Sequence, residues 1–148
     1  MKKIFVDSDV ILDVIFEREP HIADSKQILS YIEKNIFIGF TSSLIIANCY
    51  YVISSNLNHK TAITAINKLR SIFKILPLSD KEIGESINSH FTDFEDGIEY
   101  FIALNNGINT IITRNIKDYR KADCNVFMPN DFLKLHEIKS VIEKNEPY

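Results

Sequence analysis

The chain has 148 residues, of which 45% are hydrophobic, so it is long enough and apolar enough to bury one core. Its 17 basic and 20 acidic residues give a formal net charge of −3, which argues against a dedicated basic nucleic-acid scaffold but not against an enzyme that acts on RNA. No apolar stretch approaches the roughly 20 residues that a membrane span needs, and Asp7 and Asp9 interrupt the apolar run at the N-terminus, which argues against a signal peptide.

Strands and helices alternate along the sequence. In chain order, the hydrophobic pattern predicts a strand at 3–7, helices at 9–16 and 21–34, a strand at 36–40, helices at 44–55 and 59–73, a strand at 74–77, a helix capped by Ser79 or Asp80, a helix at 93–106, strands at 108–113 and 124–128, and a short helix at 129–133. Pro20 separates the first two helices because proline cannot continue the helical hydrogen-bond ladder. Strands that alternate with helices predict an α/β fold with a central parallel sheet and helices on both faces.

The sequence contains no internal repeat, linker or domain boundary. We therefore expect one domain at residues 1–135, followed by a polar and partly loose tail at residues 136–148. Cys49 and Cys124 each stand beside apolar residues, and we expect both to be buried, reduced thiols, as in a cytoplasmic protein that associates with no membrane.

Acidic residues follow the predicted strands. Asp7 ends the first strand, and Asp96 begins the helix at 93–106. Asp118 lies just beyond Thr113, which ends a later strand. In a parallel sheet these strand ends lie on one side, so we expect the carboxylates to converge. Like charges that converge repel one another unless a cation compensates for them, which suggests a divalent metal ion and phosphate chemistry.

For each acid taken singly, a purely structural role is expected about as often as a functional one. Asp7 could cap the helix that follows it, and Asp96 could be an ordinary acid in the first turn of a helix. Two further acid pairs share a helix face through i, i+4 spacing and are expected to be solvated: Asp9 with Asp13, and Glu95 with Glu99.

Four segments stand out by their order and spacing. They are residues 5–13 (FVDSDVILD), 41–44 (TSSL), 93–98 (DFEDGI) and 112–119 (ITRNIKDY). Together they resemble a PIN domain, most closely those of the bacterial PIN proteins that include VapC-type toxins. The resemblance extends from the first strand to about Phe132, although no single motif is specific. It implies a PIN-like three-layer α/β/α fold with a central parallel sheet.

The resemblance also implies acidic residues at four positions around one or two Mg²⁺ or Mn²⁺ ions. Asp7 matches the first position and Asp96 the third, whereas amides stand at the other two, Asn48 at the second and Asn115 at the fourth. Asp118 matches a further acid that many members carry. An amide oxygen can still ligate a hard cation but brings no charge, so the implied metal ligands are Asp7, Asp96 and Asp118. Losing two carboxylates should weaken the binding of the metal unless Asp9 and Asp118, which are both expected near the same edge, compensate.

The implied activity is metal-dependent hydrolysis of RNA phosphodiester bonds. In that activity Thr113 could contact phosphate or a metal-bound water, and Arg114 and Lys117 could pair with RNA phosphates. The structural alternatives are a strand-end hydroxyl that bonds to the backbone for Thr113 and plain solvation for the two cations. The resemblance implies a cognate antitoxin as partner. The apolar residues 44–53 exceed what one small sheet needs, and a homodimer face or an antitoxin groove would use them.

Three functions from different classes compete. The first is a metal-dependent ribonuclease that acts as the toxin of a toxin–antitoxin pair. The second is a catalytically weak or inactive PIN fold that binds RNA or a protein partner without cleavage, and the two differ in whether Asn48 and Asn115 still permit catalysis. The third, a receiver-like signalling domain, ranks last. It needs an aspartate after a middle strand and a lysine after a late one, whereas here the residues that follow include Pro77 and Pro129.

Overall fold

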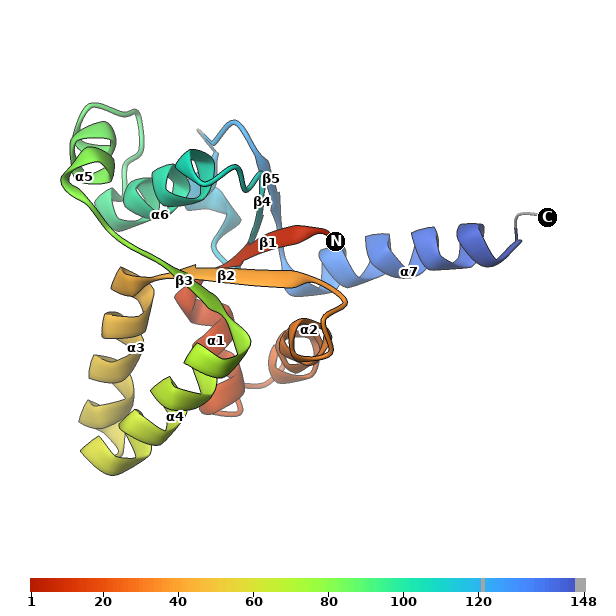
Figure 1. Ribbon diagram of the computed structural model, residues 1–148, viewed down its shortest axis with the longest axis horizontal. Coiled ribbons are helices and arrows are strands. Elements are labelled where there is room, and N and C mark those ends of the chain that lie inside the picture. The colour runs from red at the N-terminus through yellow and green to blue at the C-terminus, as the bar shows by residue number, and fades with distance from the viewer. Residues whose placement is uncertain (121, 146–148) are drawn as a thin grey trace.

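The structure is a computed structural model that describes residues 1–120 and 122–145, with side chains as far as Glu137 in the last helix. Five strands form one parallel sheet in the order β3-β2-β1-β4-β5 (Figure 1). In chain order the strands are β1 Lys3–Val6, β2 Ile38–Ser42, β3 Lys74–Leu76, β4 Thr110–Ile112 and β5 Asn125–Phe127. The central strand β1 is in register with both neighbours, since Phe5 pairs with Phe40 of β2 and with Ile111 of β4.

Helices cover both faces of this sheet. In chain order they are α1 Ser8–Ile15, α2 Ile22–Glu33, α3 Ser43–Asn56, α4 His59–Ile72, α5 Asp80–Ile87, α6 Phe94–Asn105, the 3-10 helix η1 Ile116–Tyr119, and α7 Pro129–Asn145. In Figure 1, α1 to α4 lie on one side of the sheet, and α5 and α6 lie on the other. The predicted three-layer α/β/α fold is therefore confirmed.

Polar side chains begin most of the helices. Asp7 caps α1, Ser42 caps α3, Asn58 caps α4, Ser79 and Glu82 form a capping box on α5, and Asp93 caps α6. Two of these caps also end or directly follow a central strand, because Asp7 follows β1 and Ser42 ends β2. Helix starts and strand ends thus meet at one edge of the sheet, which is where the acidic residues were expected.

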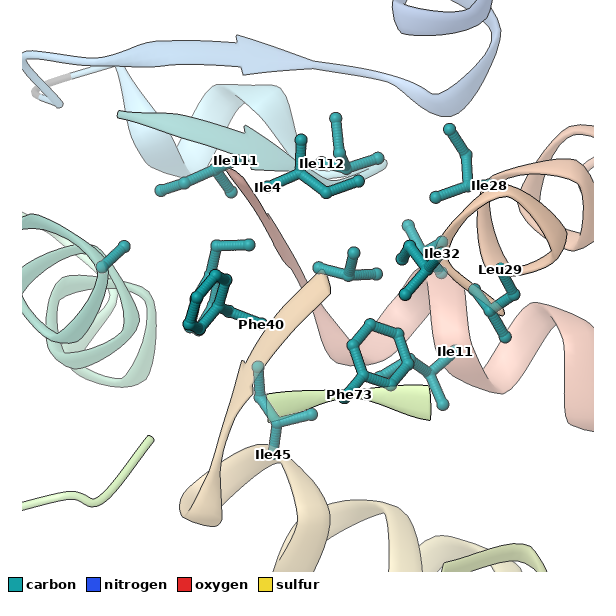
Figure 2. Packing of buried hydrophobic residues seen from close by; sticks show 14 of the residues in the cluster. Ile4, Ile11, Ile28, Leu29, Ile32, Phe40, Ile45, Phe73, Ile111 and Ile112 are labelled. Carbon is teal, nitrogen blue, oxygen red and sulfur yellow. The ribbon is translucent and has the colours of Figure 1, made fainter. Parts of the chain in front are cut away.

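The core lies between the sheet and the helices on each side. Figure 2 shows Ile28 and Ile32 of α2 turned toward the sheet, where Ile4 and Ile112 are fully buried. Burying each such side chain contributes about 1.5–3 kcal/mol relative to leaving it exposed. The approach of α2 to β2 requires a glycine, since a Cβ at Gly39 would lie 2.6 Å from Cγ2 of Ile32.

Two predicted boundaries were wrong. The second strand was expected at residues 36–40, but β2 starts and ends two residues later, so that Ser42 is both its last residue and the cap of α3. The final helix was expected to end near residue 133, before a loose tail, but α7 continues to Asn145. The sequence from Asp131 to Asn145 contains no glycine or proline to stop it. The expected domain end at residue 135 falls inside α7, and residues 146–148 of the expected tail lie outside the described residues.

Two expectations from composition can be compared with the structure. Both cysteines are free; Cys49 is buried, and Cys124 is half-buried rather than fully so. Within residues 1–120 and 122–145, no helix is long and apolar enough to cross a membrane.

Candidate metal centre

The ends of β1 and β4 bring the first predicted site residues together. Asp7 directly follows β1, and its N–H donates to the carbonyl of Ile112 at 3.0 Å, which extends the pairing of the two strands by one residue. Thr113 follows β4 on the adjacent strand. The two side chains therefore meet at the carboxyl edge of the sheet, as the ends of neighbouring parallel strands should.

Asp7 combines the structural and the functional interpretations. Its Oδ1 caps α1 by accepting the N–H of Ser8 at 2.7 Å. Its Oδ2 accepts the hydroxyl of Thr113 at 3.0 Å and the hydroxyl of Tyr119 at 3.3 Å. Burial raises the pKa of this carboxyl, and the hydrogen bonds offset part of the effect. Oδ1 of Asp7 therefore caps α1, whereas Oδ2 faces the site and is bonded there by Thr113 and Tyr119.

The expectation that Asp9 and Asp13 lie on a solvated helix face was wrong. Asp9 Oδ2 accepts the backbone N–H of Arg114 at 3.0 Å. The fully buried Asp13 carboxylate accepts Nε–H and Nη2–H of Arg114 at 2.6 and 3.0 Å. The segment after β4 covers this face of α1, which helical spacing alone could not reveal. Burial and the nearby charge of Asp7 raise the pKa of Asp9 to about 6.

Three further carboxylates come together beside Asp7. One oxygen each of Asp93, Asp96 and Asp118 lies within 4.8 Å of the others. Asp96 and Asp118 were predicted metal ligands, whereas Asp93 was expected only to begin a helix, where it accepts the N–H of Asp96 at 3.0 Å. Burial, followed by the charges of Asp7 and Asp93, raises the pKa of Asp96 to about 8. Asp7 therefore lies close to this trio, although it is not one of its members.

This donor set fits a divalent cation such as Mg²⁺ or Mn²⁺. Hard cations prefer carboxylate oxygens, and here Asp7 at the start of α1 adds a carboxylate to the trio, whose members come from the start of α6 (Asp93 and Asp96) and from η1 (Asp118). Asp9 Oδ1 is buried and has no hydrogen-bond partner in the described part of the chain, so an oxygen remains available to a ligand. Burial raises the pKa values of Asp7, Asp9 and Asp96, and the charge of Asp7 raises those of Asp9 and Asp96 further; a bound cation would oppose both effects.

Glu99 is a site residue that the sequence interpretation missed. It was expected on a solvated face with Glu95, but only 3% of Glu99 is exposed, whereas Glu95 is exposed as expected. Its Oε1 accepts the hydroxyl of Ser42 at 2.9 Å, and burial raises its pKa to about 8, with further contributions from Asp7 and Asp96. The available signal was its spacing, since Glu99 follows Asp96 by three residues and shares its helix face.

Of the other predicted site residues, Asn115 contacts the site, Lys117 is exposed, and Asn48 makes no hydrogen bond through its side chain to the described residues. Asn115 donates its backbone N–H to Thr113 Oγ1 at 3.0 Å and its side-chain amide to Asp118. Lys117 is exposed on η1. Asn48 lies half-buried in the second turn of α3, and its side chain makes no hydrogen bond to the described residues.

Thr113, which follows β4, and Tyr119, on η1, both donate hydrogen bonds to the carboxylate of Asp7. Thr113 is fully buried and donates to Asp7, with a longer contact of 3.4 Å to Asp9. Its hydroxyl was predicted to contact phosphate or a metal-bound water, or else to bond to the backbone. In the structure it contacts the acidic side chains and also accepts the backbone N–H of Asn115. Tyr119 was not predicted, because the 3-10 helix that carries it gives no periodic signal.

Comparison with known proteins places this arrangement in a family. Residues 3–117 match the family model of the PIN domain. Ribonuclease VapC1 of Aquifex aeolicus is 31% identical, over 88% of this chain and 93% of that protein. Among solved structures, VapBC2 from Rickettsia felis bound to a promoter DNA fragment has a TM-score of 0.67 at 16% identity, covering 85% of this chain and 98% of that one. VapC20 from Mycobacterium tuberculosis, a sarcin–ricin loop cleaving toxin, has a TM-score of 0.59 at 12% identity, covering 73% and 86%.

The structural likenesses support the fold, and the family model and the VapC1 relative extend the relationship to the sequence itself. The segments that carry Asp7 and Asp96 fall within the matched residues. The chain therefore belongs to the PIN-domain family and is a homologue of the VapC ribonucleases.

Proposed function

We propose that this protein is a metal-dependent ribonuclease that hydrolyses RNA phosphodiester bonds as the toxin of a toxin–antitoxin pair. The observation that carries the proposal is the group of carboxylates formed by Asp93, Asp96 and Asp118, with the charge of Asp7 acting on Asp96 from the adjacent strand end. It occurs in a chain that is 31% identical to a ribonuclease over nearly its whole length. Carboxylates grouped in this way suit a divalent cation, and a divalent cation suits phosphate chemistry.

In this proposal Asp7, Asp96 and Asp118 hold the Mg²⁺ or Mn²⁺ ion, with Asp9 and Asp93 in support. The bound ion would lower the pKa of a water molecule and stabilise negative charge on the scissile phosphate. Thr113 and Tyr119 orient the Asp7 carboxylate by donating to Oδ2, and Ser8 fixes Oδ1. Because the pKa of Asp96 is about 8, its carboxyl must release a proton near neutral pH before it can act as a ligand.

Contacts with RNA are proposed for the segment that follows β4. Lys117 is exposed on η1 and is free to approach a phosphate. Two N–H groups of Arg114 already bind Asp13, so Arg114 would contact RNA only with the rest of its guanidinium. Thr113 is fully buried, so we assign it to orienting Asp7 and make its contact with phosphate secondary.

We also propose that Asn48 and Asn115 stand where other members of the family carry acids. Asn115 supports this because its amide donates to Asp118, one of the proposed ligands. An amide at these positions leaves the cation fewer charges and makes the remaining carboxylates more important.

The proposed partner is an antitoxin. Similar solved structures include VapBC from Salmonella typhimurium bound to DNA and a toxin–antitoxin complex from Klebsiella pneumoniae. A homodimer remains a prediction, and light scattering on the purified protein measures it directly.

The experiment compares cleavage of a mixed RNA panel with Mg²⁺, with Mn²⁺ and with EDTA, using antitoxin-free protein and the variant Asp7→Asn. Asparagine retains a side-chain oxygen that can cap α1 but removes the charge, so the variant should fold. We expect cuts with either metal, none with EDTA, and at least an about 100-fold loss in Asp7→Asn. Folded protein that makes no cuts with any metal would support the alternative, a PIN fold that binds without cleaving.

A further inference from the structure

We infer that Glu99 contributes a carboxylate to the cation site and thereby replaces the acid that is missing at Asn48. The inference rests on the proposed function and adds to it a residue outside the motif positions. Glu99 lies on α6 three residues after Asp96, so the two side chains leave the same face of the helix about one turn apart.

The first support is a buried oxygen without a partner. Only 3% of Glu99 is exposed, and Oε2 has no hydrogen-bond partner within the described residues. Buried polar atoms in folded proteins almost always have a partner, so a ligand at this oxygen is expected.

The second support is the position of Glu99 between the acidic cluster and α3. Asp7 and Asp96 both add to the effect of burial in raising the pKa of Glu99, so its carboxyl lies near the cluster. After burial, Asp7 and Glu99 are also the two charges that raise the pKa of the Cys49 thiol to about 12. Cys49 follows Asn48 on α3, so the charge of Glu99 reaches the helix on which the second acid is missing.

The third support is the anchor of Glu99 at the start of α3. Ser42 donates its hydroxyl to Glu99 Oε1 at 2.9 Å and accepts the N–H of Ile45 at 3.0 Å as the helix cap. This contact fixes Oε1 and leaves Oε2 as the oxygen available to the cation. The positive end of the α3 dipole also favours an ionised carboxylate here.

The test is Mn²⁺ binding by isothermal titration calorimetry, with Glu99→Gln against the wild type. Glutamine keeps the volume and an oxygen for Ser42 but removes the charge. The matched control is Glu95→Gln, an exposed glutamate one turn earlier on α6. We expect Mn²⁺ affinity to fall at least about tenfold in Glu99→Gln and to stay at the wild-type value in Glu95→Gln. Equal affinity in Glu99→Gln and the wild type would overturn the inference, as would a wild type that binds no Mn²⁺.

A double variant tests the role of Glu99 separately from any loss of stability that Glu99→Gln causes. The double variant Asn48→Glu with Glu99→Gln moves the carboxylate back to α3. We expect it to recover Mn²⁺ affinity and the rise in melting temperature on adding Mn²⁺, both of which Glu99→Gln loses. A merely structural role for Glu99 would lower the melting temperature equally with and without Mn²⁺, and that result would contradict the inference.

The binding and cleavage measurements separate this inference from the proposed function. If Mn²⁺ binding depends on Glu99 but the wild type cuts no RNA, the result would support the role of Glu99 and contradict the proposed ribonuclease activity. RNA cleavage together with Mn²⁺ binding that ignores Glu99 would support the ribonuclease and overturn the role of Glu99.

Discussion

At the scale of single residues, the site depends on where charge is present and where an amide replaces it. Asn48 and Asn115 bring oxygen atoms without charge to positions where the family resemblance implies acids. Asn115 already bonds to Asp118, and Asn48 lies half-buried on α3. If their missing charge limits the binding of the cation, restoring it should change the activity more than the stability.

We therefore predict that Asn48→Glu with Asn115→Asp raises kcat/KM for RNA cleavage at limiting Mg²⁺ by about tenfold or more, because two added carboxylates strengthen the binding of the cation. The measurement is the cleavage rate across a Mg²⁺ titration. The gain should disappear at saturating Mg²⁺ if it comes from affinity alone. An unchanged Mg²⁺ dependence would show that these two positions lie outside the cation site.

Arg114 has a structural task that can be separated from contact with RNA. It makes two hydrogen bonds to Asp13, which is fully buried, and the only other cation paired with Asp13 in the described residues is Arg18, at 3.8 Å. We predict that Arg114→Ala lowers the free energy of unfolding by about 2–3 kcal/mol, since it leaves a buried carboxylate largely unpaired. Urea denaturation measures this loss.

The control for Arg114 is Lys117→Ala, which removes an exposed cation on the same segment. It should leave the free energy of unfolding within about 0.5 kcal/mol of the wild type. If Arg114→Ala is equally mild, Asp13 must find another partner, and the ion pair is not structural.

At the scale of elements, the close contact between α5 and α6 positions the acids of α6. A Cβ at Gly97 would collide with Ser86 Oγ and lie 3.2 Å from the Cβ of Phe91. Ser86 Oγ is itself fixed by donating to the carbonyl of Phe94 at 2.8 Å, so it cannot turn aside without losing that bond. Gly97 therefore permits the helix that carries Asp96 to pack against α5.

We predict that Gly97→Ala destabilises the protein by about 1–3 kcal/mol, even though alanine favours helices, because the added methyl overpacks this contact. The matched control is Gly84→Ala on α5, where a Cβ meets nothing within 4 Å. That substitution should be neutral or slightly stabilising. Thermal unfolding of the two variants side by side gives the comparison, and equal melting temperatures would contradict the packing argument.

The elements also show what the sequence could and could not predict. Periodicity and caps predicted every strand and α-helix, because local spacing reports which side of an element is apolar. The caps at Asp7 and Ser79 follow from short-range chemistry. Asp13 and Glu99 were assigned to solvent because the residues that cover them, Arg114 and Ser42, lie far away in the sequence. Spacing along one helix carries no information about such contacts.

At the scale of the whole molecule, the acidic cluster makes folding and metal binding depend on pH in opposite ways. In the unfolded chain these carboxyls have pKa values near 4. In the folded chain the pKa of Asp9 rises to about 6, and the pKa values of Asp96 and Glu99 rise to about 8. Between about pH 4 and pH 8 the folded protein therefore holds more protons than the unfolded chain.

Because stability falls with pH wherever the folded state binds more protons, the metal-free protein should lose stability as the pH rises through this range. A cation competes with those protons, so its affinity should increase over the same range. We predict that in EDTA the melting temperature is lower at pH 8 than at pH 5.5, and that the rise on adding Mn²⁺ is larger at pH 8. Asp96→Asn removes one of the titrating groups and should flatten both trends. A melting temperature in EDTA that climbs from pH 5.5 to pH 8 would mean that these carboxyls are ionised and compensated without a metal, and that the cluster is not built around a cation.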